Sequence, residues 1–368
     1  MRVGLIAPPW LPVPPPAYGG SEVVIDLLAR GLQDAGHDVV LFAHAASTCD
    51  VTLRSAFSEK AELPIGNCAH ELHHALAAYD ALSDVDVIHD HTLAGPLLAK
   101  AHLTSPAPAV VTTNHGPFND VLGPIYSAVA DRLPIVAISE SQAAPFGRHR
   151  VARVIHHGLN VEEFPFGQGD GGYVLFLGRM APEKGVHLAV RAARRAGARL
   201  VVAAKMREPA ERSFFAQEVE PFLGGGVEYI GEADASAKRR LLAGASALLN
   251  PICWEEPFGM VMIESLACGT PVIVTRRGAA PEIVEHGVTG FICDDEHDLG
   301  SALTAAAGLD RRRCRASVVE RFSAQRMVAA HVELYTDVLE GRVLEGRSLS
   351  HRLRPPLGAL TLARGAAG

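Results

Sequence analysis

The sequence lacks the features of a membrane-spanning or disulfide-stabilised protein. No run of apolar residues approaches the about 20 residues that a transmembrane helix requires. The six cysteines form no CxxC motif and no closely spaced pair, so we expect reduced thiols. Residues 3–16 are interrupted by prolines and lack the layout of a signal peptide, which predicts a cytoplasmic protein without a transmembrane segment.

A dinucleotide-binding fingerprint and repeats of fixed period are also missing. After an expected strand at residues 3–7, the sequence runs through a long proline-rich loop to Gly19-Gly20, without a GxGxxG motif. No acidic residue follows at the spacing that binds a ribose in such a fold, and both observations argue against NAD. The absence of repeats argues against a solenoid.

The first half of the chain has few positive charges. Residues 1–165 carry nine basic and 17 acidic residues, whereas the remainder carries 25 and 24, for an overall formal charge of −7. The acidic half argues against a nucleic acid as partner and against an anionic membrane at that surface. Residues 341–368 hold five arginines and one glutamate. This basic tail is predicted to be mobile, and a peripheral membrane contact through it stays open.

What the sequence does contain is a regular alternation of strands and helices. With 368 residues, 48% hydrophobic and 20% charged, the chain is globular and too long for one ordinary core. The alternation predicts an α/β protein with two doubly wound, Rossmann-like parallel sheets. The expected domains are residues 1–165 and 166–323. A helix at 324–340 is expected to pack back towards the first domain, followed by the tail at 341–368.

The expected elements follow from short β-rich runs and helical stretches. In the first domain the strands are 3–7, 39–43, 87–89, 109–113, 135–138 and 154–157, and the helices are 21–36, 70–82 and 93–102. In the second domain the strands are 173–177, 200–204, 227–230, 247–251, 271–275 and 291–293, and the helices are 187–196, 235–243, 260–268 and 280–286. A last helix is expected at 324–339. Ligands of such folds bind at the carboxyl ends of the strands.

Two carboxylates, Glu256 and Glu264, are separated by seven residues. Glu264 lies in a stretch of apolar and small residues that is typical of a buried helix, where a lone carboxylate is costly without a partner. Because this segment holds no cation, we expect Glu264 to bind the hydroxyls of a ligand. Glu256 precedes the helix, whose free backbone amides between the two acids form an anion site. This combination predicts a nucleotide-sugar site.

Two cations follow the first strand of the second domain. The run Gly178-Arg179 to Lys184-Gly185 comes after a strand end, so both side chains emerge at the carboxyl edge of the sheet. An arginine fork and a lysine ammonium together neutralise a diphosphate. A solvated loop with two surface cations is the alternative, and the acid pair makes it the weaker interpretation.

The first domain adds further candidates at its own strand ends. Gly19 and Gly20 allow the backbone to approach a ligand closely before a helix. His115 follows the strand at 109–113, where a functional and a structural role are about equally favoured. The run 89–91, His-Asp-His, is interpreted as a wall of the cleft.

Together these motifs resemble the family 4 glycosyltransferases of GT-B fold, in which two Rossmann-like domains face each other across a cleft. The resemblance covers the chain from Met1 to about Leu339. It rests on Glu256-x7-Glu264, Gly178-Arg179 with Lys184-Gly185, Gly19-Gly20, His115 and the run 267–272, Ala-Cys-Gly-Thr-Pro-Val. It implies a retaining hexosyltransferase with a UDP- or GDP-linked donor, no metal or other cofactor, and an unidentified acceptor that is a small molecule, a lipid or a glycan.

The resemblance also implies roles for individual residues. Arg179 and Lys184 hold the donor diphosphate, and Glu264 holds the ribose. Glu256 and the backbone of residues 258–261 hold the donor sugar, with His115 above it. The expected catalytic residues are Arg179, Lys184, Glu256 and His115, and the expected substrate-binding residues are Gly19, Gly20, Phe258, Gly259, Met260, Val261, Glu264 and Ile230. Residues 203–206, Ala-Ala-Lys-Met, depart from the glycine-rich turn common at this place in the family.

Retention at the anomeric carbon is implied without a protein nucleophile. An ordinary retaining hydrolase places a carboxylate nucleophile and a carboxylic acid beside the bond. The two acids here are better explained as hydroxyl binders. The departing phosphate then takes the proton of the acceptor, and the acceptor attacks from the same face.

Other functions compete with this interpretation. His70, Glu71 and His74 fit HExxH on a helix and suggest a zinc hydrolase, which we regard as improbable because short motifs often match by accident. A nucleotide-sugar epimerase or a phosphorylase could use the same architecture. A non-catalytic nucleotide-sugar binder is the non-enzyme alternative. The Asp84-Val85-Asp86 motif precedes a strand, so we interpret it as a loop and expect no metal.

Overall fold

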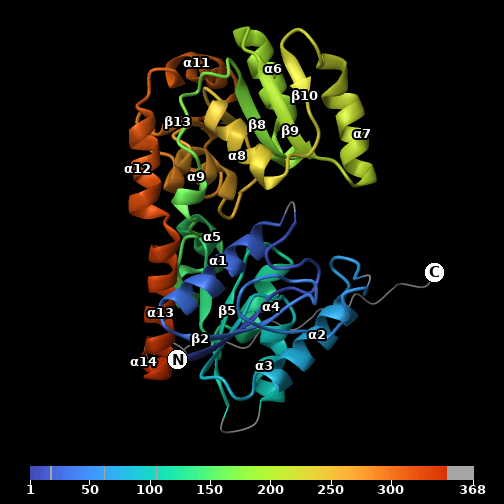
Figure 1. Cartoon of the computed structure of the whole chain (residues 1–368), viewed down its shortest axis with the longest axis vertical. Helices are drawn as coiled ribbons and strands as arrows, with labels where there is room; N and C mark the ends of the chain where they lie inside the picture. The colour runs from blue at the N-terminus through green and yellow to red at the C-terminus, as the bar shows by residue number, and fades with distance from the viewer. Residues whose placement is uncertain (17–18, 62, 104–106, 346–368) are drawn as a thin grey trace, which may run out of the picture.

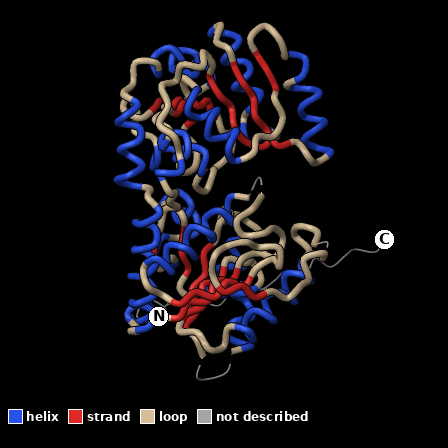
Figure 2. Tube along the Cα trace, viewed as in Figure 1, coloured by secondary structure: helices blue, strands red, loops and turns tan. Residues whose placement is uncertain are grey.

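The computed structural model describes residues 1–16, 19–61, 63–103 and 107–345. Figure 1 shows two α/β domains stacked along the long axis of the molecule, with α12 and α13 running along one side of them. In Figure 2 the strands of each domain form a central sheet with helices packed around it. Most of the arginine-rich tail, from residue 346 on, lies outside the described residues, as do residues 17–18 of the proline-rich loop. No helix in the described ranges combines the length and the apolarity needed to cross a bilayer.

The first domain contains a seven-stranded parallel sheet in the order β3-β2-β1-β4-β5-β6-β7. Its strands are β1 Arg2–Ile6, β2 Asp38–Phe42, β3 Thr52–Arg54, β4 Val87–Asp90, β5 Ala109–Thr113, β6 Ile135–Ala137 and β7 Arg153–Val154. The helices are α1 Gly20–Asp34, α2 Cys68–Ala81, α3 Gly95–His102, α4 Leu122–Val129 and α5 Glu140–Phe146. The central strands are buried because helices cover both faces of the sheet.

The second domain contains a six-stranded parallel sheet in the order β10-β9-β8-β11-β12-β13. Its strands are β8 Val174–Arg179, β9 Leu200–Lys205, β10 Val227–Tyr229, β11 Leu248–Asn250, β12 Val272–Thr275 and β13 Gly290–Cys293. Its helices are α6 Val186–Ala196, α7 Pro209–Glu218, α8 Ala235–Gly244, α9 Met260–Ala267, α10 Ala280–Ile283, α11 Glu296–Ala306 and α12 Arg311–Arg321. The prediction of two doubly wound, Rossmann-like sheets is confirmed.

The chain then returns to the first domain through α13, Ala324–Leu339, before the short α14, Arg342–Glu345. Buried side chains of α13, such as Val328 and Tyr335, share one apolar cluster with α1 and the first sheet. Arg153 of β7 is bound to the same helix, to Glu333 at 2.9 Å and Asp337 at 2.8 Å. The core of the first domain therefore includes a helix from the far end of the chain.

Several elements were not expected from the sequence: β3, α4, α5, α7, α11 and α12. Two of them do carry an apolar pattern at helical spacing that was overlooked: Leu122, Ile125, Tyr126 and Val129 in α4, and Leu299, Ala302, Leu303 and Ala306 in α11. α12 begins with three consecutive arginines and buries only Cys314, Ser317 and Val318, and α5 is seven residues long and contains Pro145. The largest differences in length are at two carboxyl ends, since β7 ends at Val154 and not at residue 157, and α10 ends at Ile283 and not at residue 286.

The packing of α13 on α1 predicts opposite effects for the same substitution at two helical glycines. A Cβ at Gly31 would clash with the Val328 side chain, whereas a Cβ at Gly300 of α11 has nothing within 4 Å. Overpacking at a tight contact costs about 1–3 kcal/mol, and removing a glycine from a helix interior gains up to about 1 kcal/mol. We expect Gly31→Ala to lower Tm and Gly300→Ala to raise it in thermal denaturation. An equal rise of Tm in both variants would contradict the packing described here.

Candidate active site

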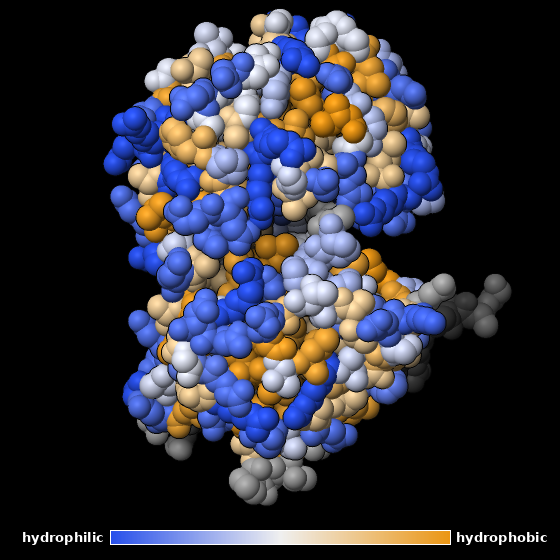
Figure 3. Space-filling model, in the orientation of Figure 1, coloured by the Kyte–Doolittle hydropathy of each residue, from blue (hydrophilic) through white to orange (hydrophobic). Residues whose placement is uncertain are grey.

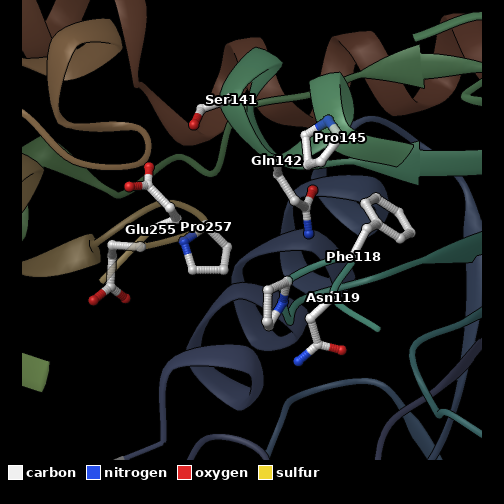
Figure 4. A pocket seen from close by; sticks show the side chains of 9 residues that line it. Phe118, Asn119, Ser141, Gln142, Pro145, Glu255 and Pro257 are labelled. Carbon is white, nitrogen blue, oxygen red and sulfur yellow. The ribbon is translucent and has the colours of Figure 1, made fainter. Parts of the chain in front are cut away.

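A cavity of about 220 Å³ lies between the two domains. Figure 4 shows Glu255 and Pro257 of the second domain on one side of it, with Phe118, Asn119 and Gln142 of the first domain on the other. The remaining lining residues are Pro117, Ser141, Pro145 and Glu256. In the space-filling view of Figure 3 the surface is hollowed between the two domains. Because the lining follows β5 and β11, the cavity lies where strands of both sheets end, as expected for ligand sites in this architecture.

Lys184 and Glu256 form an ion pair at the edge of the second sheet. Both side chains are mostly buried, with 15% and 13% of their surfaces exposed. The indole Nε1 of Trp254 donates a hydrogen bond of 2.8 Å to Glu256 Oε2, and the Lys184 ammonium lies 5.2 Å from the centre of the same indole ring. The structure therefore brings together a predicted phosphate-binding cation and a predicted sugar-binding acid.

Gly185 explains how Lys184 reaches this position. It follows the short 3-10 turn Pro182–Lys184 in the left-handed conformation, with φ of 75°, and precedes α6. A Cβ at Gly185 would also collide with the carbonyl oxygen of Pro251, just after β11. Only glycine satisfies both the positive φ and the close approach, so this residue lets the Lys184 turn pack directly against the loop that carries Glu256.

Arg179 lies at the end of β8 and faces other acids. Its guanidinium forms an ion pair with Glu183 and lies 3.9 Å from Glu211 Oε1. The Arg179 side chain is 37% exposed, so it is accessible to a ligand. Arg179 and Lys184 thus emerge from the same edge of the sheet but are held by different carboxylates.

Glu264 has a protein partner that differs from the expectation. It is buried in α9 and accepts a hydrogen bond of 2.5 Å from the ammonium of Lys238 on α8. The segment around Glu264 contains no cation, so this partner was not foreseen, and the binding of ligand hydroxyls by Glu264 stays a prediction. The helix α8 precedes α9 in sequence and contacts it in the fold, which is how the lysine reaches the carboxylate.

The N-terminus of α9 lies between the two acids. Gly259 caps the helix with φ of 92°, and a Cβ there would lie 2.6 Å from Met262 Cε. Phe258 is buried, with its ring 5.1 Å from that of His157. Met260 and Val261 begin the helix and are partly buried, and Met260 packs against apolar clusters of both domains. This segment therefore contributes both the free amides of a helix end and a contact between domains.

The other predicted binding residues lie further from the acid pair. Gly19 and Gly20 lead into α1 in the first domain, and a side chain at Gly19 would clash with Pro15 and Glu22. Among the described residues, no hydrogen bond or ion pair joins either glycine to Arg179, Lys184, Glu256 or Glu264. Ile230 follows the edge strand β10 and is 43% exposed, with β9 and β8 between that strand and β11.

His115 belongs to a cluster of five histidines, His89, His91, His115, His157 and His331. The Nε2 of His115 is 2.9 Å from His91 Nδ1, and its Nδ1 is 3.4 Å from His157 Nε2. His89 is hydrogen-bonded to Tyr335 of α13 and to Thr113, each at 2.7 Å. The cluster thus joins β4, β5, α13 and the interdomain linker, which is the segment 155–173 between β7 and β8. His115 is its partly exposed member after β5.

Burial lowers the pKa of every histidine in this cluster. The pKa values of His115 and His331 fall to about 4, and those of His89, His91 and His157 lie well below the ordinary value. The main cause is desolvation, to which the neighbouring imidazoles add repulsion between their charged forms. All five rings are therefore neutral at pH 7, and His115 is a neutral hydrogen-bonding group.

The HExxH residues have separate structural partners. His74 Nε2 is bonded to the carbonyl of Ala7 at 2.9 Å, and Glu71 accepts a hydrogen bond of 2.7 Å from the amide of Leu93. Both side chains are buried, whereas the ring of His70 lies against Phe57. Within the described ranges no group of three histidine, cysteine or acidic side chains is arranged to hold a metal ion.

Sequence reasoning missed three features of the site: Lys238, Trp254 and the histidine cluster. Lys238 lies on a helix with no other sign of function, and Trp254 precedes the acid pair without any motif of its own. The cluster could have been suspected from the histidines at 89, 91, 115 and 157, since three of them follow or end expected strands. Nothing in the sequence connects His331 with these four histidines, because its helix lies far from them along the chain.

Comparison with known proteins identifies two matching family models that together span most of the chain. Residues 18–163 match Glycosyltransferase Family 4, and residues 162–309 match Glycosyl transferases group 1. The chain is 26% identical over 352 residues to a phosphatidyl-myo-inositol mannosyltransferase of Mycolicibacterium smegmatis, a match that covers 88% of each chain.

Solved structures resemble it over nearly the whole chain. AviGT4, a glycosyltransferase involved in avilamycin A biosynthesis, is 27% identical, with a TM-score of 0.72 and coverage of 92% of this chain and 98% of that one. Anabaena Alr3699/HepE, solved in complex with UDP-glucose, is 17% identical and has a TM-score of 0.72, with coverage of 92% and 100%.

The histidine cluster predicts that stability falls in mild acid. Because the folded-state pKa values are depressed, the unfolded chain binds protons first as the pH drops below about 6.5. Stability is complete above that pH and is lost progressively as the pH approaches 4, by up to about 1.4 kcal/mol per pH unit for each histidine.

His331→Gln tests this expectation, because it removes one titrating group and keeps a donor for the Met327 carbonyl. Urea unfolding between pH 7 and pH 5 should show a shallower decline of the free energy of unfolding in this variant than in the wild type. His149→Gln, at an exposed position, is the control and should follow the wild-type curve. Parallel curves for all three proteins would contradict a role of the cluster.

Proposed function

Because the chain belongs to the family 4 glycosyltransferases of GT-B fold, we propose that it transfers a hexose from a nucleoside-diphosphate sugar to a hydroxyl-bearing acceptor with retention at the anomeric carbon. It is a glycosyltransferase, and the proposal concerns its donor, its residues and its mechanism. The second domain, residues 166–323, takes the donor, and the first domain, residues 1–165, takes the acceptor. We place the reaction in the cytoplasm, in keeping with six free thiols.

One observation carries the proposal: Lys184 and Glu256 meet in a largely buried pair beside the interdomain cavity. A cation and a carboxylate in contact at the carboxyl edge of a sheet match the two kinds of polar group in a sugar phosphate, the phosphate and the hydroxyls. The ammonium receives the phosphate oxygens, and the carboxylate accepts hydrogen bonds from sugar hydroxyls. The N-terminus of α9 lies next to them and adds its amides and dipole.

The comparisons support a nucleotide-sugar donor. HepE was solved with UDP-glucose, and the mycobacterial relative is named as a mannosyltransferase. In our proposal Arg179 and Lys184 bind the diphosphate and Glu264 binds the ribose. The backbone of residues 258–261 receives the sugar together with Glu256. Gly19 and Gly20 approach the phosphates from the first domain, and Ile230 lies on the nucleotide side.

The charges of the donor site are matched within the protein. Arg179 pairs with Glu183, Lys184 with Glu256 and Lys238 with Glu264. A diphosphate that enters the site competes with the carboxylates for Arg179 and Lys184, and the released Glu256 turns to hydroxyls of the sugar. The cost of leaving a buried charge unpaired is thereby kept small in both states.

In the proposed reaction the bond between the anomeric carbon and the diphosphate oxygen breaks, and the electron pair leaves with the phosphate. Arg179, Lys184 and the α9 amides stabilise the charge that grows there. The acceptor oxygen forms its bond to the same face of the anomeric carbon and gives its proton to the departing phosphate. The neutral His115 orients sugar hydroxyls. No metal or cofactor is needed in this scheme.

Four alternatives give different results in simple assays. An epimerase would change the donor without releasing a nucleotide, and a phosphorylase would require inorganic phosphate. A non-catalytic binder would bind the donor and leave it intact. A zinc hydrolase built on His70, Glu71 and His74 would lose its activity with a chelator, whereas the proposed transferase would keep it.

The function is tested first by a thermal-shift screen against UDP, GDP and their hexose conjugates. A ligand that binds only the folded state raises Tm. Release of free nucleoside diphosphate from the best donor in the presence of candidate acceptors then measures turnover. A protein stabilised by no nucleotide, or one that releases none from any donor, would refute the proposal.

Lys184→Ala should reduce turnover strongly, because the lysine acts on charge that grows in the transition state. We expect kcat for nucleotide release to fall by roughly 10²–10³-fold, the cost of losing one such group. Arg199→Ala is the matched control. Arg199 pairs with Glu228 at the opposite, amino-terminal end of the same sheet, so its loss should leave kcat unchanged. Full turnover in Lys184→Ala would remove this residue from the mechanism.

Glu264→Gln should affect binding more than chemistry, because ribose contacts are the same in the ground and transition states. Titration calorimetry with the best nucleoside diphosphate should show a weaker Kd. In steady-state assays KM for the donor should rise while kcat stays close to the wild-type value. A lower kcat with unchanged nucleotide affinity would show that Glu264 acts on the reacting sugar instead.

A further inference from the structure

Glu282 connects the two domains and is bound to Ser141, one of the residues that line the cavity. It belongs to α10 of the second domain, yet its carboxylate binds the start of α5 in the first domain. One oxygen accepts a hydrogen bond of 2.9 Å from the amide of Glu140, and the other accepts one of 2.7 Å from the amide of Ser141. His156 of the linker lies 2.8 Å from Glu282 through its Nε2. One carboxylate thus holds a helix end and the linker together.

On the side of the first domain, α5 supports the loop of His115. Gln142, two residues after the first contact with Glu282, donates hydrogen bonds to the carbonyls of Asn114 at 2.8 Å and Gly116 at 2.5 Å. Its carbonyl oxygen Oε1 accepts a bond from the amide of Ile138 at 2.7 Å. The two carbonyls flank His115, so any shift of α5 moves the backbone on both sides of that residue.

On the side of the second domain, the same element supports the loop of Glu256. The turn before α10 contains Gly278, with φ of 52°, where a Cβ would collide with the backbone of Glu256. The amide of Ala279 donates a hydrogen bond of 2.9 Å to the Glu256 carbonyl. Arg321 at the end of α12 in turn binds the carbonyl of Glu282. A shift of α10 therefore moves the Glu256 loop.

We propose that Glu282 is an interdomain positioning residue, which fixes the distance across the cavity between the Glu256 loop and the His115 loop. The chain of contacts runs from Glu256 through the Gly278 turn to Glu282, and from there through α5 and Gln142 to the backbone around His115. Ser141 and Gln142 line the same cavity as Glu256. Glu282 touches no substrate in this proposal, which rests on the proposed function for its catalytic consequence.

Both the backbone amides of α5 and the imidazole of His156 favour a carboxylate at this position. The pKa of Glu282 lies below its ordinary value, because the hydrogen bonds from His156, Ser141 and Glu140 stabilise the ionised form despite partial burial. An ionised carboxylate accepts both amides at once, whereas a carboxamide offers one acceptor and a mismatched NH₂ group. Glutamine therefore keeps the size of the side chain and breaks about half of the contact.

The proposal separates catalysis from nucleotide binding. Apart from Gly19 and Gly20, every residue assigned to the diphosphate and the ribose lies in the second domain, so a shift between domains leaves the side-chain contacts with the nucleotide intact. A misplacement of about 1 Å in a reacting pair costs up to about 10²-fold in rate. For Glu282→Gln we expect kcat to fall by about 10–100-fold, with Kd for UDP or GDP, whichever the screen identifies, changed less than twofold.

A second variant removes the hydrogen-bond donor, the amide of residue 140, and leaves the accepting carboxylate of Glu282 in place. Ser139 has extended φ and ψ angles of −158° and 161°, as a residue before proline requires, and Glu140 is the first residue of the helix, where proline is tolerated. Proline at position 140 therefore keeps the backbone conformation and deletes the amide that binds Glu282. Glu140→Ala keeps this amide and loses only the exposed pair with Arg148. Glu285→Gln is a further control, since Glu285 pairs with Arg321 within the second domain.

The variants are compared by kcat, by Kd for the nucleotide and by amide hydrogen exchange of residues 139–146 in the intact protein. We expect Glu282→Gln and Glu140→Pro to lower kcat alike, and the double variant to lose little more than either one. Faster exchange at Ser141 in Glu282→Gln is also expected. Glu140→Ala and Glu285→Gln should match the wild type.

Several outcomes would overturn the proposal. These are wild-type kcat in Glu282→Gln, unchanged exchange at Ser141, or a loss of nucleotide affinity parallel to the loss of kcat, which indicates general damage. If the wild type itself releases no nucleotide from any donor, the proposed function fails. The exchange measurement then still decides whether Glu282 holds the two domains together.

Discussion

The ion pair between Lys184 and Glu256 is the contact on which the arrangement of the site depends. It joins two loops that leave neighbouring strands, β8 and β11, and the left-handed Gly185 makes their approach possible. Two charges with so little exposed surface are tolerated because each compensates the other, and the Trp254 indole satisfies a further lone pair. Loss of either partner would leave a buried charge alone, which ties the local fold to the chemistry of the site.

Both domains line the cavity, so its shape depends on how the two domains contact each other. A site within one domain needs only its own core, whereas this one needs two sheets held at a fixed separation. The contacts between the domains are polar where Glu282 binds α5, and apolar where Met260 packs against clusters of both domains. A polar contact of this kind fixes the relative orientation of the two domains without joining them permanently.

The sequence predicted the architecture well where a single strong pattern decides the structure. The strand Ala109–Thr113 and the helix Ala324–Leu339 have the expected bounds, because one is a short β-branched run and the other a long amphipathic stretch. Helix α12 escaped notice because its arginines bind backbone carbonyls, as Arg315 does with Phe164, and leave no apolar stripe. In the site, the convergence of Lys184 and Glu256 followed from parallel strands that end at one edge. Lys238 and Glu282 could not be foreseen, since their partners come from other elements.

The return of α13 makes the first domain discontinuous in sequence. His89 and Tyr335 are hydrogen-bonded although 246 residues separate them, and α13 covers part of the apolar surface of α1. On the ribosome, the amino-terminal half therefore emerges without the last piece of its own interior. Part of its apolar surface stays uncovered until the whole second domain has been synthesised, which makes this half the segment most exposed to misassembly and to chaperones during translation.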